Sequence, residues 1–241
     1  MCQFLSLISD GKGNMYYFDY EIRKKIISGE MERETDSHSH IIKHFFGEET
    51  DTRAFHGKGR NFNQYEYNPL TKVFTIDQIN LPDDSEEVKQ KCLNLDFKTI
   101  VPELQIHEII NPRNIQHGDK ANDSEIALLE MWASVWASVW ASVWASVWDS
   151  VRDSVGDSVW DSVRDSVWDS VRASVGDSVW AYVSDFFTIA NWKYTNNEPG
   201  KNPFQPCIDL WNLGLVPSFD SKTWRLHQMC DNAKVIYEWH K

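Results

Sequence analysis

The chain has 241 residues and a net charge of −12, with 41% hydrophobic and 25% charged residues. This composition is typical of globular proteins and excludes wholesale disorder. The acidity argues against nucleic acid and against an anionic membrane surface as partners, because both carry negative charge. No run approaches the roughly 18 apolar residues of a membrane span. We therefore expect no nucleic-acid partner and no membrane partner.

The first 115 residues predict a mixed α+β domain. The expected elements are, in chain order, strands at 2–9 and 15–20, helices at 21–29 and 36–47, a hairpin over 64–78, and a short helix at 83–95. The hairpin is indicated by alternating aromatic and β-branched runs on both sides of Asn68-Pro69. Residues 97–110 are strand-like, but Pro102 favours an edge strand or an extended loop.

The helix expected at 36–47 carries histidines one turn apart. His40 and His44 are candidate metal ligands for that reason. The HExxH pattern is missing, and Asp36 is the one further ligand nearby in the sequence. Histidines on a polar helix face are commoner than ligands, so we expect neither a metal nor another cofactor.

Cys2 is a candidate catalytic nucleophile. In class II glutamine amidotransferases, a cysteine exposed by removal of the initiator methionine attacks the substrate. The start MCQF resembles that arrangement but lacks the Gly that commonly follows the cysteine. The alternative is an ordinary buried cysteine in the first strand.

The remaining cysteines suggest a reducing compartment. Cys92, Cys207 and Cys230 form no CxxC pair and have no His at ligand spacing. Scattered thiols are typical of intracellular proteins. The start MCQFLSLIS lacks the basic region of a signal peptide. We therefore expect a cytoplasmic protein that is not secreted.

A tetrapeptide repeat dominates the middle of the chain. Residues 116–131 predict a linker and the start of a helix, and the repeat segment extends over 132–183. The pattern x-[AD]-S-V occurs twelve times, with Trp seven times, Arg three times and Gly twice at the first position. Ser and Val never change, so we expect this pair to pack inside and the variable pair to face outward.

Two backbones are compatible with the repeat. In an α-helix, four residues overshoot one turn by about 40°, which gives a drifting stripe with right-handed winding. Gly156 could divide such a helix into a hairpin. The alternative is a short-sided β-solenoid, because repeats this short are typical of such coils. The stretch NDSEIALLEMW before the repeat favours the helix.

The early repeats predict an interaction surface. Their first positions are all Trp, a residue that is enriched in interface hot spots, and an exposed apolar patch of this size on a monomer would favour association. We therefore expect a homo-oligomer built through residues 132–180, with a further protein partner as a second possibility. The expected interaction residues are Trp132, Trp136, Trp140, Trp144 and Trp148.

The C-terminal segment, 184–241, predicts a helix at 205–214 and a hairpin of strands at 223–227 and 234–239. It is too small for a core of its own. We expect it to pack on the domain at 1–115, so that the fold class is α+β, with one small mixed domain built from the N- and C-terminal segments and interrupted by the repeat.

Three stretches carry a resemblance. NQYEYNPLTKVFTIDQIN, the DSVW/DSVR/ASVG tract, and DLWNLGLVPSFDSKTWRLH with the closing KVIYE together resemble a family of uncharacterised proteins associated with phages, giant viruses or prokaryotic mobile elements. The resemblance implies a viral or mobile-element accessory protein and carries over no functional residue. The sequence thus predicts a non-enzymatic structural or protein-interaction protein that self-associates through its repeat. The alternative is an N-terminal-nucleophile, amidohydrolase-like enzyme using Cys2.

Overall fold

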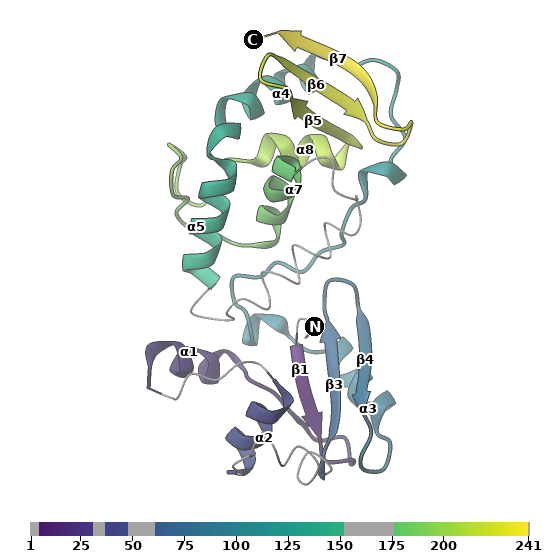
Figure 1. Cartoon of the computed structure of the whole chain (residues 1–241), viewed down its shortest axis with the longest axis vertical. Coiled ribbons are helices and arrows are strands. Elements are labelled where there is room, and N and C mark those ends of the chain that lie inside the picture. Colours follow the sequence, from purple (N-terminus) through teal and green to yellow (C-terminus); the bar gives the residue numbers. More distant parts are fainter. Residues whose placement is uncertain (1–4, 31–36, 48–60, 152–175, 241) are drawn as a thin grey trace. The chain divides into compact units, whose positions relative to one another are not determined.

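The computed structural model describes residues 5–30, 37–47, 61–151 and 176–240 (Figure 1). The fold class is α+β, as predicted from the sequence. The described chain divides into an N-terminal unit, up to Leu104, and a C-terminal unit that contains Gln105–Ser150 and the residues from Gly176 onward. Each unit has its own antiparallel sheet.

The N-terminal unit is built on a four-stranded sheet. Its strands are β1 (Leu5–Ser9), β2 (Met15–Tyr16), β3 (Asn63–Asn68) and β4 (Val73–Gln78), in the order β2-β1-β3-β4. All five residues of β1 are buried, which is expected of a central strand covered on both faces. The predicted turn at Asn68-Pro69 is confirmed, because the Asn68 side chain accepts hydrogen bonds from the backbone nitrogens of Leu70 and Thr71.

Three helices accompany this sheet: α1 (Tyr20–Ser28), α2 (His38–Phe46) and α3 (Ser85–Leu93). The side chain of Asp19 caps α1 by accepting from the Ile22 nitrogen, and Gly29 ends the helix in the left-handed conformation. Helix α2 packs against β1, where Ile41 and Ile42 join Ile8 in one buried cluster. All three helices agree with the sequence prediction.

A buried carboxylate fixes the loop that precedes α3. Asp84 accepts hydrogen bonds from Ser9 Oγ at 2.8 Å, the Gly13 nitrogen at 2.8 Å, Asn63 Nδ2 at 2.9 Å and Tyr65 Oη at 2.7 Å. Burial alone would raise the pKa of Asp84, but these four donors outweigh burial and lower it. The side chain therefore joins the β1–β2 turn, strand β3 and the start of α3.

The C-terminal unit combines helices with a three-stranded sheet. The helices are α4 (Asp123–Val135), α5 (Val139–Val151), α7 (Gly176–Val183) and α8 (Gln205–Asn212), and the strands are β5 (Leu215–Phe219), β6 (Thr223–Gln228) and β7 (Lys234–His240), in the order β5-β6-β7. A 3₁₀ turn at Trp136–Ser138 joins α4 to α5 without a break. Figure 1 shows α7 and α8 beside this long helix.

Helix α8 lies at the centre of this unit. It packs on α4, α7 and β5. Trp211 of α8 stacks on Tyr182 of α7, with ring centroids 4.8 Å apart and planes at 12°. The indole nitrogen of Trp211 also donates to the Ile110 carbonyl at 2.8 Å. The C-terminal segment thus packs against the helices that flank and include the repeat.

The division into units differs from the one expected. Residues 184–241 were expected to pack on the domain at 1–115, whereas in the structure they share a compact unit with α4, α5 and α7. The expected linker is also part of this unit. Gln228 Nε2 donates to the His117 carbonyl, and Lys234 Nζ pairs with Asp119 Oδ1 at 2.7 Å.

In α5 and α7 the repeat is helical and not a β-solenoid. The preferred prediction of a helix is therefore confirmed for these parts. The turn expected at Gly156 lies outside the described residues. By length and composition the helix over Asp123–Val147 could also cross a membrane, which differs from the expectation that no segment is apolar enough for a span. A core helix passes the same test; Leu129, Trp132 and Val139 are buried, and 33% of the apolar window as a whole is buried.

Candidate functional site

From Val139 onward the invariant residues of the described repeats face inward, whereas in the first tetrapeptide the prediction is wrong, because Ser134 is exposed and Trp132 is buried. On α5, the valines and serines at the last two positions of successive repeats are buried: Val139, Val143, Val147, Ser142 and Ser146. On α7, Ser178 and Val179 are buried in the same way. The predicted inward orientation of the Ser-Val pair is therefore confirmed for the described parts of α5 and α7. The variable first position faces outward on α5 at Trp140 and Trp144.

The five candidate tryptophans differ in how far their side chains are exposed. Trp132 is only 1% exposed and contacts Phe204 edge-on at 6.3 Å, so it is a core residue and not an interaction residue. Trp136 is half-buried. Trp140 and Trp144 are 56% and 46% exposed. The side chain of Trp148 lies outside the described residues.

A change of helical phase explains this difference. Four α-helical residues overshoot one turn by about 40°, so each repeat presents its tryptophan at a new angle. The 3₁₀ turn at Trp136–Ser138 rotates the chain further, because it has about three residues per turn. Before this turn the unit buries Trp132 and leaves Val135 half-exposed; after it the unit buries Val139 and exposes Trp140.

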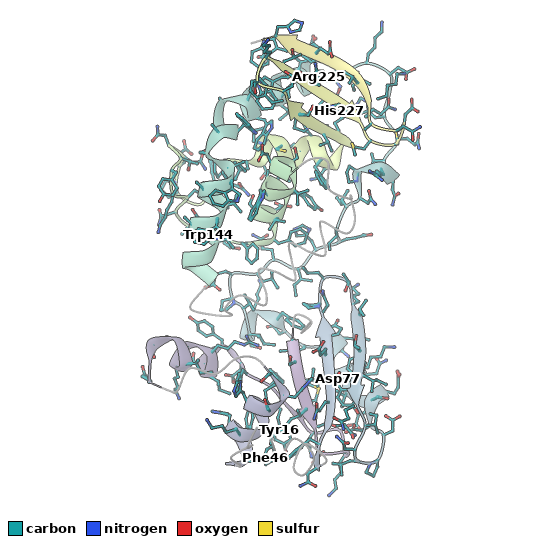
Figure 2. The ribbon with its side chains drawn as sticks, viewed as in Figure 1. Tyr16, Phe46, Asp77, Trp144, Arg225 and His227 are labelled. Carbon is teal, nitrogen blue, oxygen red and sulfur yellow. The ribbon has the colours of Figure 1, made fainter. Side chains whose placement is uncertain are left out.

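Exposed and half-buried tryptophan rings of α5, α7 and the 3₁₀ turn form a group that we call the tryptophan ladder. Trp140 and Trp144 stack with centroids 6.4 Å apart and planes at 12°, and Trp180 of α7 meets Trp140 edge-on at 6.5 Å. Trp144 is labelled on α5 in Figure 2. The ladder comprises Trp136, Trp140, Trp144 and Trp180.

The sheet supports one end of the ladder. Trp136 contacts Phe219 of β5 at 5.2 Å and Trp224 of β6 at 5.6 Å, both edge-on. Phe219 and Trp224 stack on each other at 4.7 Å. These contacts hold the half-buried ring of Trp136 in a fixed position, so the ladder begins on a rigid base.

Backbone and polar contacts hold the ladder's helix in place. The Lys193 nitrogen donates to Ser146 Oγ at 2.7 Å, which ties the loop after α7 to α5. Trp136 Nε1 donates to Asp177 Oδ2 at 2.5 Å, which ties α7 to the start of the repeat. From Met131 to Trp148 the sequence contains no charged residue. The ladder is therefore a largely apolar surface on an acidic chain, with the Asp177 carboxylate beside Trp136 at one end.

The metal candidates on α2 are occupied by other contacts. His40 Nδ1 lies 3.0 Å from Ser37 Oγ, and the ring of His44 lies edge-on to Phe18 at 5.4 Å. Within the described residues no group of three His, Cys, Asp or Glu side chains is placed to hold a metal ion. No third ligand lies beside His40 and His44 among the described residues, and Asp36 lies outside them.

The structure does not test the cysteine candidate. Cys2 lies outside the described residues. Cys92 and Cys207 are buried, and burial raises the pKa of each thiol to about 12. Both thiols are therefore protonated at neutral pH and are poor nucleophiles.

Sequence reasoning missed a hydroxyl–imidazole pair on the C-terminal sheet. Ser218 Oγ lies 2.7 Å from His227 Nε2, and His227 Nδ1 lies 2.9 Å from the Ala233 carbonyl. A nucleophilic triad would place a carboxylate at that second nitrogen. Here a turn carbonyl takes its place, so the pair fastens the β6–β7 turn to β5.

Sequence reasoning also missed the ladder's support. Asp177 belongs to the last tetrapeptide and Trp180 follows it directly, but Phe219 and Trp224 come from strands far along the chain. No protein-family model matches the chain, and neither a curated protein nor a solved structure matches it. The surface is therefore interpreted from its own chemistry.

Proposed function

We propose that the protein is a non-enzymatic interaction protein that self-associates through the tryptophan ladder. The observation that carries the proposal is the stacked pair Trp140 and Trp144, which stay about half exposed on an otherwise well-packed helix. Large aromatic side chains contribute most of the binding energy in protein interfaces when a partner covers them. Exposed aromatic patches on soluble proteins commonly mark such interfaces.

A second copy of this chain is the partner that the surface fits best. A two-fold interface brings the same patch of both copies together. Because the repeat advances about 6 Å every four residues and drifts in angle, a surface with the same advance and drift matches it along its length. The same ladder on another copy has this property.

Charge favours the same contact. Two copies that each carry a net charge of −12 repel each other over most of their surfaces. The stretch from Met131 to Trp148 has no charged side chain, so repulsion is weakest there. Burial of the indole rings then supplies the attraction.

The test compares two variants of the intact chain by light scattering after size-exclusion chromatography at micromolar concentration. Trp140→Ser combined with Trp144→Ser removes the exposed pair and leaves the buried Val and Ser in place. The dissociation constant should rise on the order of 100-fold or more, because two hot-spot residues are lost.

Leu213→Ser is the matched control. Leu213 is 42% exposed at the end of α8, close to the exposure of Trp144, but it is not part of the ladder. This variant should associate as the unsubstituted chain does. A double variant that remains as strongly associated as the control would contradict the proposal, as would a shift of the control to monomer.

A further inference from the structure

A groove runs beside the first repeats on the C-terminal unit. Its volume is about 340 Å³. One wall comes from the end of α4 and the 3₁₀ turn, and the other comes from the loop between α7 and α8. The lining residues are Ser134, Val135, Ala137, Ser138, Tyr194, Thr195, Asn196, Asn197 and Pro203. None of these is charged, although the chain carries a net charge of −12.

The hydroxyls on the helical wall are set to accept hydrogen bonds. Ser134 Oγ donates to the Met131 carbonyl at 2.7 Å, and Ser138 Oγ donates to the Val135 carbonyl at 2.8 Å. Each hydroxyl has one proton, so its remaining capacity is as an acceptor. A ligand that satisfies this wall must therefore bring O–H or N–H donors.

The opposite wall of the groove supplies two amide side chains and one aromatic ring. The amide of Asn196 can donate and accept, while the Asn197 amide nitrogen donates to the Lys201 carbonyl and its oxygen can accept from a ligand. Tyr194 is 71% exposed, and its backbone has a φ of 60°. A residue other than glycine pays an energetic penalty in this left-handed conformation, and such strained residues cluster at binding sites. The loop thus holds an aromatic ring at the groove with no burial to compensate.

We propose that this groove binds a neutral sugar. Ring hydroxyls would donate to Ser134 and Ser138 and exchange hydrogen bonds with the asparagine amides, while the C–H face of the sugar would lie on the ring of Tyr194. The uncharged lining selects against phosphorylated and acidic sugars. The volume is near the lower end of the range for ligand pockets, roughly 300–1,000 Å³, which suits a single sugar or a short oligosaccharide. This binding is independent of self-association through the ladder.

The experiment is saturation-transfer NMR on the intact chain. The probes are glucose, galactose and N-acetylglucosamine at millimolar concentration, with glucose 6-phosphate as the charged counterpart of the first. We expect transfer to at least one neutral sugar and a weaker signal from the phosphate ester. Absence of transfer to all three neutral sugars would overturn the proposal, and so would preferential binding of the phosphate ester.

Two variants at one position locate the site. Tyr194→Gly removes the ring and relieves the positive φ, so the fold should be at least as stable, while the affinity for the sugar should fall at least about tenfold. Tyr194→Phe keeps the ring and should bind the sugar as before. Sugar binding that is unchanged in the correctly folded Tyr194→Gly variant would place the ligand elsewhere and refute the assignment.

Discussion

Trp136 Nε1 donates a hydrogen bond to Asp177 Oδ2 at 2.5 Å, and this contact joins the second tetrapeptide of the repeat to the last one. Both residues occupy variable positions, the first and the second of their tetrapeptides. The variable positions therefore do more than face solvent, because at this point they bring α7 and the start of the repeat together within one unit.

Removal of this acceptor should loosen the unit. We expect Asp177→Ala to lower the free energy of unfolding by about 1 kcal/mol, the usual size of one hydrogen bond at a partly exposed site. Asp177→Asn keeps an oxygen acceptor and should lose less. Urea unfolding followed by tryptophan fluorescence measures both. Equal losses in the two variants would show that the charge of Asp177, and not its hydrogen bond to Trp136, is the stabilising feature.

Truncation of two tryptophans in different tetrapeptides should change the stability of the fold by very different amounts. Trp132→Ala empties a buried site against Phe204 and should cost about 3–5 kcal/mol. Trp140→Ala removes an exposed ring and should change the stability of the monomer by roughly 0.5 kcal/mol or less. Denaturation of each variant at a concentration where the chain is monomeric makes the comparison. Similar losses for both would contradict the change of helical phase at the 3₁₀ turn.

The pair His117 and Glu125 should make the C-terminal unit less stable at high pH. His117 Nε2 lies 2.9 Å from Glu125 Oε1, and both side chains are largely buried. Burial alone lowers the pKa of His117, but its hydrogen bonds to Glu125 and to the Gly118 carbonyl, with the charge of Glu125, raise the pKa above its ordinary 6.5. A raised pKa stabilises the folded state fully below pH 6.5, and this stabilisation is lost as the pH rises through the folded-state pKa.

The measurement is the free energy of unfolding as a function of pH from 6 upward. His117→Gln serves as the control, because it keeps a hydrogen-bond donor for Glu125 but does not titrate. The difference between the two proteins should shrink as the pH rises. A difference that is independent of pH would mean that His117 has the same pKa in the folded and unfolded states, and a difference that grows with pH would mean that its folded-state pKa is lowered; either result would contradict the prediction.

The carboxylate of Asp84 should be needed for the N-terminal unit. Asp84→Asn places an amide where four donors converge, so at least one donor loses its acceptor, at a cost of about 1.5–3 kcal/mol. The lowered pKa of Asp84 adds a pH effect: the stabilisation is present above the ordinary value of 3.8 and is lost as the pH falls through the lower folded-state pKa.

Hydrogen exchange followed by mass spectrometry reports on this unit separately, because each peptide is measured by itself. Tryptophan fluorescence would not serve, since residues 1–131 contain no tryptophan. Peptides from β1, β3 and α3 should exchange faster in Asp84→Asn, and peptides from α8 should not change. Asp83→Asn, one residue earlier at an exposed position, is the matched control. Equal effects of the two substitutions would contradict the role assigned to the buried carboxylate.

Local signals in the sequence were sufficient for most elements. Alternation of apolar residues, caps and turn residues indicate α1, α2, α3, the β3–β4 hairpin, α8 and the β6–β7 hairpin, all of which are present. Strand β5 was missed because it contains Pro217, which argues against a strand. Pro217 is tolerated there because β5 is an edge strand, paired on one side with β6.

Long-range packing could not be derived in the same way. The stretch NPRNIQHGDK has the turn formers of a free linker, yet Ile115 packs against Gly214 and His117 pairs with Glu125. Likewise, Trp132 and Trp140 occupy the same position of identical tetrapeptides. Whether each is buried depends on the helical phase and on Phe204, which lies 72 positions beyond Trp132. Identical tetrapeptides therefore cannot reveal which tryptophan is buried.

Sedimentation velocity of the intact, unsubstituted chain over a dilution series tests the central claim most directly. If the exposed rings of Trp140 and Trp144 associate with a second copy, the sedimentation coefficient should rise with concentration from that of a 28.1 kDa monomer toward that of a dimer or larger assembly. Moderate salt should strengthen the association, because it screens the repulsion between two acidic chains. A single monomeric species at every concentration and salt condition would contradict self-association through the tryptophan ladder.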